Sequence, residues 1–125
     1  MPETAISALY SARGGAAMKV YRLYFEEMFS FATEATQIAQ AQGNDRLRKL
    51  ALERALVIIG EAAKKIPRDL QSVYPQILWK DIIDLRNVIS HGYDEHTLAE
   101  LEAMAAQEVQ ALAGVLRNIL AHYEE

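Results

Sequence analysis

One segment of the chain combines residue types that act on phosphate. Residues 79–93 read WKDIIDLRNVISHGY, in which His91 follows Arg86 by five positions and Tyr93 comes two positions later. A guanidinium is the best bidentate partner for a phosphate, and an imidazole transfers protons near neutral pH. With a hydroxyl nucleophile, these groups are enough to cleave RNA without a metal. Arg86 and His91 are therefore our candidate catalytic residues.

The roles follow from the chemistry of RNA cleavage. The 2′-OH of the substrate attacks the adjacent phosphate, His91 handles a proton, and Arg86 stabilises charge on the phosphorane. Asn87, next to the arginine, is a supporting candidate that orients the phosphate or the histidine. We expect the reaction to need neither a metal nor a cofactor.

The residue types and their spacing do not indicate a metal site. The chain has no cysteine, which excludes disulfides, thiolate zinc sites and cysteine nucleophiles. One cluster of possible ligands comprises His91, Asp94, Glu95 and His96. Adjacent loop residues seldom converge on one ion, and no further set of ligands stands out, so we expect no metal site.

The two candidate residues do not meet on an unbroken helix. Five positions correspond to about 140° around an ideal helix, so Arg86 and His91 point in different directions. Convergence on one phosphate requires the helix to end near Gly92, a second subunit, or both. The residues three and four positions from Arg86 include no carboxylate, so its charge must meet water, another helix, a partner subunit or a ligand.

Four long helices with short connections are expected to position this segment. Gly43 with Asn44, Pro67 and Gly92 separate the apolar patterns, and Thr97 with Glu100 forms a capping box. The helices are predicted at about residues 19–42, 45–65, 76–90 and from 97 onward, with a short turn or helical piece at 68–73. We predict an all-α fold, an antiparallel four-helix bundle with this short extra piece before the motif helix.

The spacing of apolar residues also predicts which faces are buried. For the helix at 19–42 the expected stripe is Val20, Leu23, Tyr24, Met28, Phe31 and Ala35. For the helix at 45–65 it is Leu47, Leu50, Ala51, Ala55, Ile58, Ile59 and Ala62. Such stripes bury best against one another in a bundle.

Length and composition indicate one domain in a cytoplasmic chain. At 125 residues the chain matches a single core, which we place at residues 18–125, after a flexible N-terminal tail at 1–17. No apolar stretch approaches the roughly 20 residues of a membrane span. Glu3 stands where a secretory signal carries positive charge, so we expect no export and a cytoplasmic location.

The charge is unevenly distributed along the chain. The formal net charge of −4 argues against a broad basic surface for nucleic acid. Residues 44–80, however, carry eight basic and four acidic side chains, whereas residues 81–125 carry two basic and nine acidic ones. The basic face of the helix at 45–65 is a candidate for steering RNA or docking an acidic partner, although a solvated face is the commoner explanation.

A longer segment resembles a known family. The run LVIIGEAAKKIPRDLQSVYPQILWKDIIDLRNVISHGY, residues 56–93, is similar to the middle segment of HepT proteins in the HEPN superfamily. It contains their Arg, four residues, His, any residue, Tyr signature, their IGEA box, and the Tyr-Pro pair and Trp before the motif. The resemblance implies a helical ribonuclease toxin, whose Arg and His meet in a cleft across a homodimer.

The resemblance also implies regulation and a partner. In this family the antitoxin is a minimal nucleotidyltransferase of the MntA type, which transfers AMP from ATP to the motif tyrosine and blocks the RNA cleft. By resemblance, Tyr93 is the modified residue, and added nucleotide would bring negative charge and bulk beside the catalytic pair. Glu61, within the IGEA box, is a supporting candidate on the same basis.

Simpler interpretations stand beside these. Arg86 is explained by an interhelical salt bridge, and His91 by a favourable position at a helix C-terminus. Glu61 pairs in principle with Lys64 or Lys65 on its own helix, and Tyr93 is explained by packing of its ring. The alternative function is a non-catalytic binding or regulatory subunit of a nucleotidyltransferase.

Overall fold

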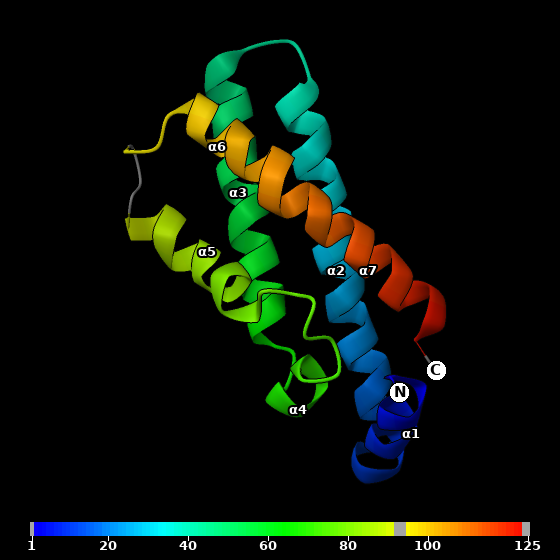
Figure 1. The fold of residues 1–125 in the computed structure, drawn as a ribbon. Coiled ribbons are helices and arrows are strands. Elements are labelled where there is room, and N and C mark those ends of the chain that lie inside the picture. The colour runs from blue at the N-terminus through cyan, green and yellow to red at the C-terminus, as the bar shows by residue number, and fades with distance from the viewer. Residues whose placement is uncertain (1, 92–94, 124–125) are drawn as a thin grey trace.

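The computed structural model describes residues 2–91 and 95–123, with side chains from residue 5 onward. Every regular element in these ranges is a helix (Figure 1). The α-helices are α1 Pro2–Arg13, α2 Gly15–Gln40, α3 Asp45–Lys64, α4 Arg68–Gln71, α5 Trp79–His91, α6 Leu98–Met104 and α7 Gln110–His122. A π-helical turn, η1 Ala105–Val109, joins α6 and α7 into one continuous helix.

The helices assemble as the sequence predicts. α2 and α3 form an antiparallel hairpin, α5 packs on α3, and the α6–η1–α7 helix crosses both α2 and α3 (Figure 1). The short α4 precedes α5, at the place where a short helical piece was expected. The prediction of an all-α bundle with this extra piece is confirmed.

Local signals set the helix ends. Asn44 caps α3 by accepting a hydrogen bond from the Leu47 amide, and Gly43 takes a φ of 136° in the turn before it. Thr97 and Glu100 form the predicted capping box at the start of α6. These caps satisfy amides that have no partner within their own helix.

The predicted buried face of α2 was partly wrong. Val20 and Leu23 are 43% and 59% exposed. The face that is fully buried comprises Met18, Phe25, Met28, Ala32 and Ala35. Leu47 and Leu50 of α3 are likewise exposed. Apolar residues lie on more than one side of these helices, so periodicity alone does not fix which side meets the core.

Residues 1–17, for which the sequence predicts a flexible tail, contain helix α1. Ile6 of this helix is 2% exposed, and Arg13 donates two hydrogen bonds of 2.9 Å to the carboxylate of Asp69 in α4. Gly14, with a φ of 92°, allows the sharp turn into α2. Tertiary contacts thus hold a segment whose local sequence carries a weak helical signal; the boundary at residue 18 stays a prediction.

An aromatic cluster fixes where α5 begins. Phe25 of α2 meets the rings of Tyr74 and Trp79 edge-on, at centroid distances of 5.6 and 6.2 Å. The Trp79 indole donates a 3.0 Å hydrogen bond to the Tyr74 carbonyl. Residues 76–78, predicted as helix, belong instead to the turn before α5, which starts at Trp79.

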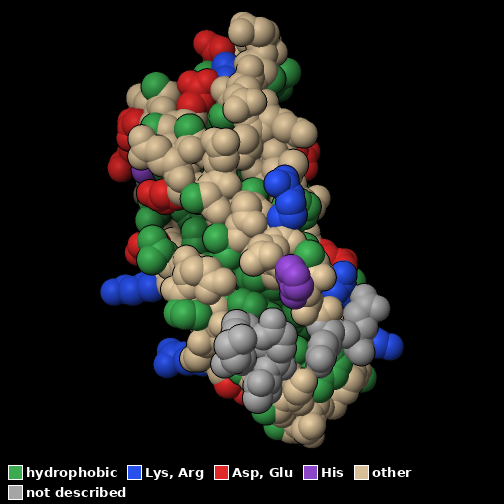
Figure 2. Space-filling model, turned by 45° about the vertical axis from the view of Figure 1, so that its right-hand side comes forward, with side chains coloured by type: hydrophobic (Ala, Val, Ile, Leu, Met, Phe, Trp, Pro, Cys, Tyr) green, Lys and Arg blue, Asp and Glu red, His purple; other side chains and the backbone are tan. Residues whose placement is uncertain are grey.

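The surface reflects the uneven charge. On the face in Figure 2, Lys and Arg side chains stand mostly singly, and acidic side chains gather mainly in the upper part of the view.

None of the helices in the described ranges combines the length and the apolar character needed to cross a membrane.

Candidate active site

α5 carries both candidate catalytic residues, on different sides. Arg86 lies on the flank that faces α3, and His91 is the last residue of the helix. Both side chains are exposed, and the His91 ring has no hydrogen bond to any other described residue. Since both belong to one unbroken helix, a single chain does not bring them onto one phosphate. Tyr93, the candidate modification site, lies outside the described residues.

Arg86 forms an interhelical ion pair with Glu61. The Arg86 Nε lies 3.4 Å from Glu61 Oε1, and the two side chains are 53% and 41% exposed. The arginine thus meets another helix, one of the possibilities that its position left open. An exposed pair of this kind contributes only about 0–1 kcal/mol, so a phosphate can displace the carboxylate at little cost.

Glu61 pairs with Arg86 on another helix and not with a lysine of its own helix, as the simpler interpretation expected. Its neighbours Lys64 and Lys65 do not form a salt bridge with it, and Lys65 instead lies 5.4 Å over the Tyr24 ring. The candidate support residue and the candidate catalytic arginine are therefore brought together by the packing of α3 on α5.

Gly60 makes this packing possible. A Cβ built at Gly60 would lie 3.0 Å from the Ile82 carbonyl oxygen and 3.1 Å from the Arg86 amide nitrogen. Both are backbone atoms, so any side chain at Gly60 would push α5 away from α3. Gly60 belongs to the IGEA box of the family resemblance, but the sequence alone does not predict this packing role. Nothing local indicates it, because the constraint comes from another helix.

Two further side chains, Asn87 and His96, make contacts on the exposed side of α5. Asn87 donates a 3.4 Å hydrogen bond to Asp84, so this supporting candidate is held by its own helix. The His96 ring lies 3.2 Å from the Val88 carbonyl oxygen and 3.8 Å from Glu100, tying the start of the next helix back to α5. The sequence suggested His96 only as a possible metal ligand. In the structure its ring links α5 to the start of α6.

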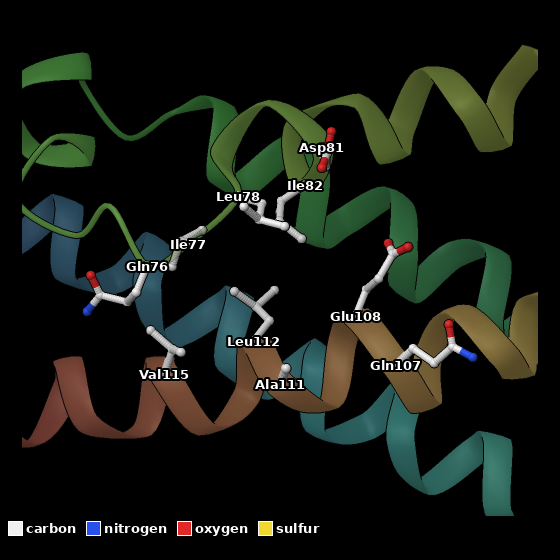
Figure 3. A pocket seen from close by; sticks show the side chains of 10 residues that line it. All are labelled: Gln76, Ile77, Leu78, Asp81, Ile82, Gln107, Glu108, Ala111, Leu112 and Val115. Carbon is white, nitrogen blue, oxygen red and sulfur yellow. The ribbon is translucent and has the colours of Figure 1, made fainter.

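A compact cavity lies on another side of α5 and does not suit RNA. It holds about 290 Å³ between the start of α5 and the η1–α7 segment (Figure 3). Its walls are mainly apolar, and the charged side chains around it are Asp81 and Glu108 (Figure 3). Two carboxylates without a lining cation repel phosphate. The candidate residue Arg86 is not among the residues that line this cavity.

The chain is similar to proteins named as ribonucleases. It is 33% identical over 75 residues to the "Probable ribonuclease HepT" of Thermococcus cleftensis, covering 60% of this chain and 68% of that protein. It is 32% identical over 82 residues to the "Putative RNase MJ0125" of Methanocaldococcus jannaschii, covering 66% and 71%. Another relative from that organism, "Putative RNase MJ1216", is 42% identical over 50 residues, or 40% and 41% of the two chains.

A family comparison covers more of the chain than any of these relatives. No solved structure gives a significant match. The model of the family described as Ribonuclease HepT-like, in contrast, matches residues 22–123, which include all of α3–α7 and most of α2. The resemblance seen in residues 56–93 is confirmed and extends on both sides of them. The chain therefore belongs to the HepT-like ribonuclease family.

Proposed function

We propose that the chain is a metal-independent endoribonuclease, the toxin of a toxin–antitoxin pair, with Arg86 and His91 as its catalytic residues. The observation that carries the proposal is that both side chains are exposed on α5 of a chain belonging to the HepT-like ribonuclease family. The relatives described above are named as ribonucleases, and a ribonuclease cleaves the phosphodiester bonds of RNA. RNA is therefore the proposed substrate.

The proposed step is an internal transfer at phosphorus. The ribose 2′-oxygen forms a bond to the adjacent phosphorus while the bond from phosphorus to the 5′-oxygen breaks. The 2′-OH loses a proton, the leaving 5′-oxygen gains one, and the products are a 2′,3′-cyclic phosphate and a 5′-OH. His91 moves a proton in this step, and Arg86 stabilises the negative charge that grows on the phosphoryl oxygens. Asn87 is a positioning residue.

A homodimer would supply the convergence that one α5 lacks. A two-fold axis near the ends of two α5 helices brings together two arginines and two histidines. The histidine of one chain can then move the proton while the arginine of the other chain stabilises the charge on the same phosphate. The angular separation of Arg86 and His91 on one helix supports this arrangement.

Glu61 fits the role of a resting partner for the arginine. In the absence of RNA it lies against Arg86 and keeps the guanidinium on the α3 side. An RNA phosphodiester carries the same single negative charge as the carboxylate and can accept from the guanidinium in a bidentate manner, so it competes with Glu61 for Arg86. Glu61 is thus a positioning residue rather than a catalytic one.

Control of the toxin would act at Tyr93. We propose that a minimal nucleotidyltransferase antitoxin transfers AMP from ATP to its hydroxyl, with release of pyrophosphate. Tyr93 is two residues beyond His91, so the added phosphate would lie beside the catalytic groups and compete with RNA.

The competing function is a non-catalytic partner of a nucleotidyltransferase. The ion pair between Arg86 and Glu61 gives this alternative some support, because it provides the arginine with a purely structural contact. The alternative predicts tight binding to the nucleotidyltransferase and no RNA cleavage by the chain alone.

The test is cleavage of a mixed RNA pool in EDTA by the purified chain, with intact mass used to verify that Tyr93 is unmodified. Wild type is compared with His91→Ala and with the matched variant His122→Ala, whose ring lies 2.9 Å from the Asn118 carbonyl oxygen in α7. We expect wild type and His122→Ala to cleave and His91→Ala to be inactive. Absence of cleavage by wild type, or equal cleavage by His91→Ala, would contradict the proposal.

A further inference from the structure

A second hollow lies next to the proposed catalytic flank of α5. It holds about 870 Å³ between the end of α3, α4 and the first turns of α5. Three cations line it: Lys64, Arg68 and Lys80, here called the groove cations. Asp84 is the single carboxylate among its lining residues, so the groove has a net positive charge in a chain whose total charge is −4.

The groove cations differ from the arginines that join the helices. Those arginines are paired with carboxylates of other segments: Arg13 with Asp69, Arg48 with Glu102 and Arg86 with Glu61. None of the groove cations forms a salt bridge or a side-chain hydrogen bond with another described residue. Three cations against one carboxylate around one hollow favour an anionic occupant.

The wall of the groove is apolar and preorganised. Trp79, Ile83 and Pro67 contribute to it. The Trp79 indole is held in place by its hydrogen bond to the Tyr74 carbonyl and by edge-on packing against Phe25. A fixed aromatic surface beside cations suits a nucleobase next to its phosphate, because stacking and charge act on neighbouring parts of one nucleotide.

The groove lies next to the ion pair between Arg86 and Glu61. Lys64 lies three residues after Glu61 on α3, and Ile83 lies three residues before Arg86 on α5. The two helices touch at Gly60, so the groove begins about one helical turn, roughly 5 Å, beyond the ion pair on both of them. A strand whose phosphate meets Arg86 therefore has its neighbouring nucleotide at the mouth of the groove.

We propose that this groove binds the RNA strand on one side of the scissile phosphate, with the groove cations contacting backbone phosphates and Trp79 facing a base. The inference rests on the proposed ribonuclease function for its choice of ligand. An acidic protein surface would satisfy the charges but has no need of the fixed aromatic wall, or of a position one turn from Arg86.

The test measures binding separately from cleavage. The full chain with His91→Ala is titrated against a fluorescein-labelled single-stranded RNA of about 12 nucleotides, a length within the usual range of such sites. In this background Lys64, Arg68 and Lys80 are all changed to Gln. Binding should weaken at least tenfold. The slope of log affinity against log salt should fall by about 2, since each lost phosphate contact contributes about 0.7.

A matched triple variant controls for net charge. Arg46, Lys49 and Arg54, on α3 but outside the groove, are changed to Gln in the same background and should leave the slope nearly unchanged. Asp84→Asn should tighten binding several-fold, a gain that misfolding cannot imitate. Unchanged binding by the groove variant, or equal losses in the two triple variants, would overturn the proposal.

The outcomes also separate this inference from the proposed function. If wild type fails to cleave RNA but the groove variant loses affinity and salt dependence, the groove stands and the ribonuclease proposal falls. If wild type cleaves and the groove variant binds RNA like its parent, the ribonuclease proposal stands and the groove is refuted.

Discussion

Gly60 of α3 lies directly against the backbone of Arg86 in α5, where an added Cβ would come within 3.1 Å of the Arg86 amide nitrogen. The neighbouring residue, Glu61, holds the Arg86 side chain by an ion pair. Two consecutive residues of α3 therefore position the candidate catalytic arginine, one through its backbone and one through its charge. Packing and chemistry at this site are coupled.

Gly60→Ala should destabilise the protein and disturb the site together. The new methyl group meets backbone oxygen and nitrogen atoms that cannot rotate away, so α5 must shift, at a cost of about 1–3 kcal/mol. Gly114→Ala in α7 is the matched control, because a Cβ there meets nothing within 4 Å. That change should stabilise by up to about 1 kcal/mol. Urea unfolding and RNA cleavage by both variants check the prediction, which fails if Gly60→Ala is as stable as wild type.

Glu61→Gln should separate substrate binding from turnover. Removing the carboxylate leaves phosphate without a competitor for Arg86, so KM should fall a few-fold, while the loosened guanidinium should lower kcat two- to tenfold, about 0.4–1.4 kcal/mol in barrier. The free energy of unfolding should change by less than about 0.5 kcal/mol, because the pair is half exposed. Glu27→Gln, on the exposed surface of α2, is the control. Equal kinetics for the two variants would contradict the positioning role.

Complementation tests the proposed dimer cleft. Arg86→Ala and His91→Ala chains should each be inactive alone. When they are refolded together, about half of the dimers carry one chain of each kind and keep one intact arginine and one intact histidine. Cleavage should therefore reappear in the mixture. Native mass spectrometry would establish that mixed dimers formed, and their complete inactivity would argue against a shared cleft.

Stability should fall at alkaline pH because of buried tyrosines. Burial, with a smaller effect of Tyr10, raises the pKa of Tyr74 to about 12 and also raises the pKa of Tyr123, whose hydroxyl donates a 2.8 Å hydrogen bond to the Met18 carbonyl. The folded state thus holds these protons more tightly than the unfolded state, whose tyrosines titrate near 10. This contribution is fully present below about pH 10 and is lost as the pH rises toward about 12.

Urea unfolding at about pH 9 and about pH 11 measures that loss, and Tyr74→Phe provides the comparison. The variant keeps the ring that packs on Phe25 but has no proton to lose, so its stability should drop less between the two pH values. An identical drop in wild type and Tyr74→Phe would rule out Tyr74 as a source of the effect.

The sequence predicted on which helix the candidate residues Arg86 and His91 lie, but not what surrounds them. The spacing of Arg86 and His91, and their placement at the end of one helix, follow from residue types and from Gly92 alone. The partner of Arg86 could not be predicted in this way, because Glu61 is 25 positions away and its contact depends on how α3 and α5 pack. The same holds for the groove cations, which come from three different segments.

By itself, the sequence determined the four long helices, the caps at Asn44 and Thr97, the all-α class and the family. The helices and their caps depend on interactions within about four residues of one another, which the order of residues specifies directly. Only the tertiary structure decided which face of α2 is buried, that α1 packs through Ile6, and that Gly60 lets Arg86 meet Glu61. Such contacts depend on the rotation and crossing of whole helices, and these are set by the packing of the complete core.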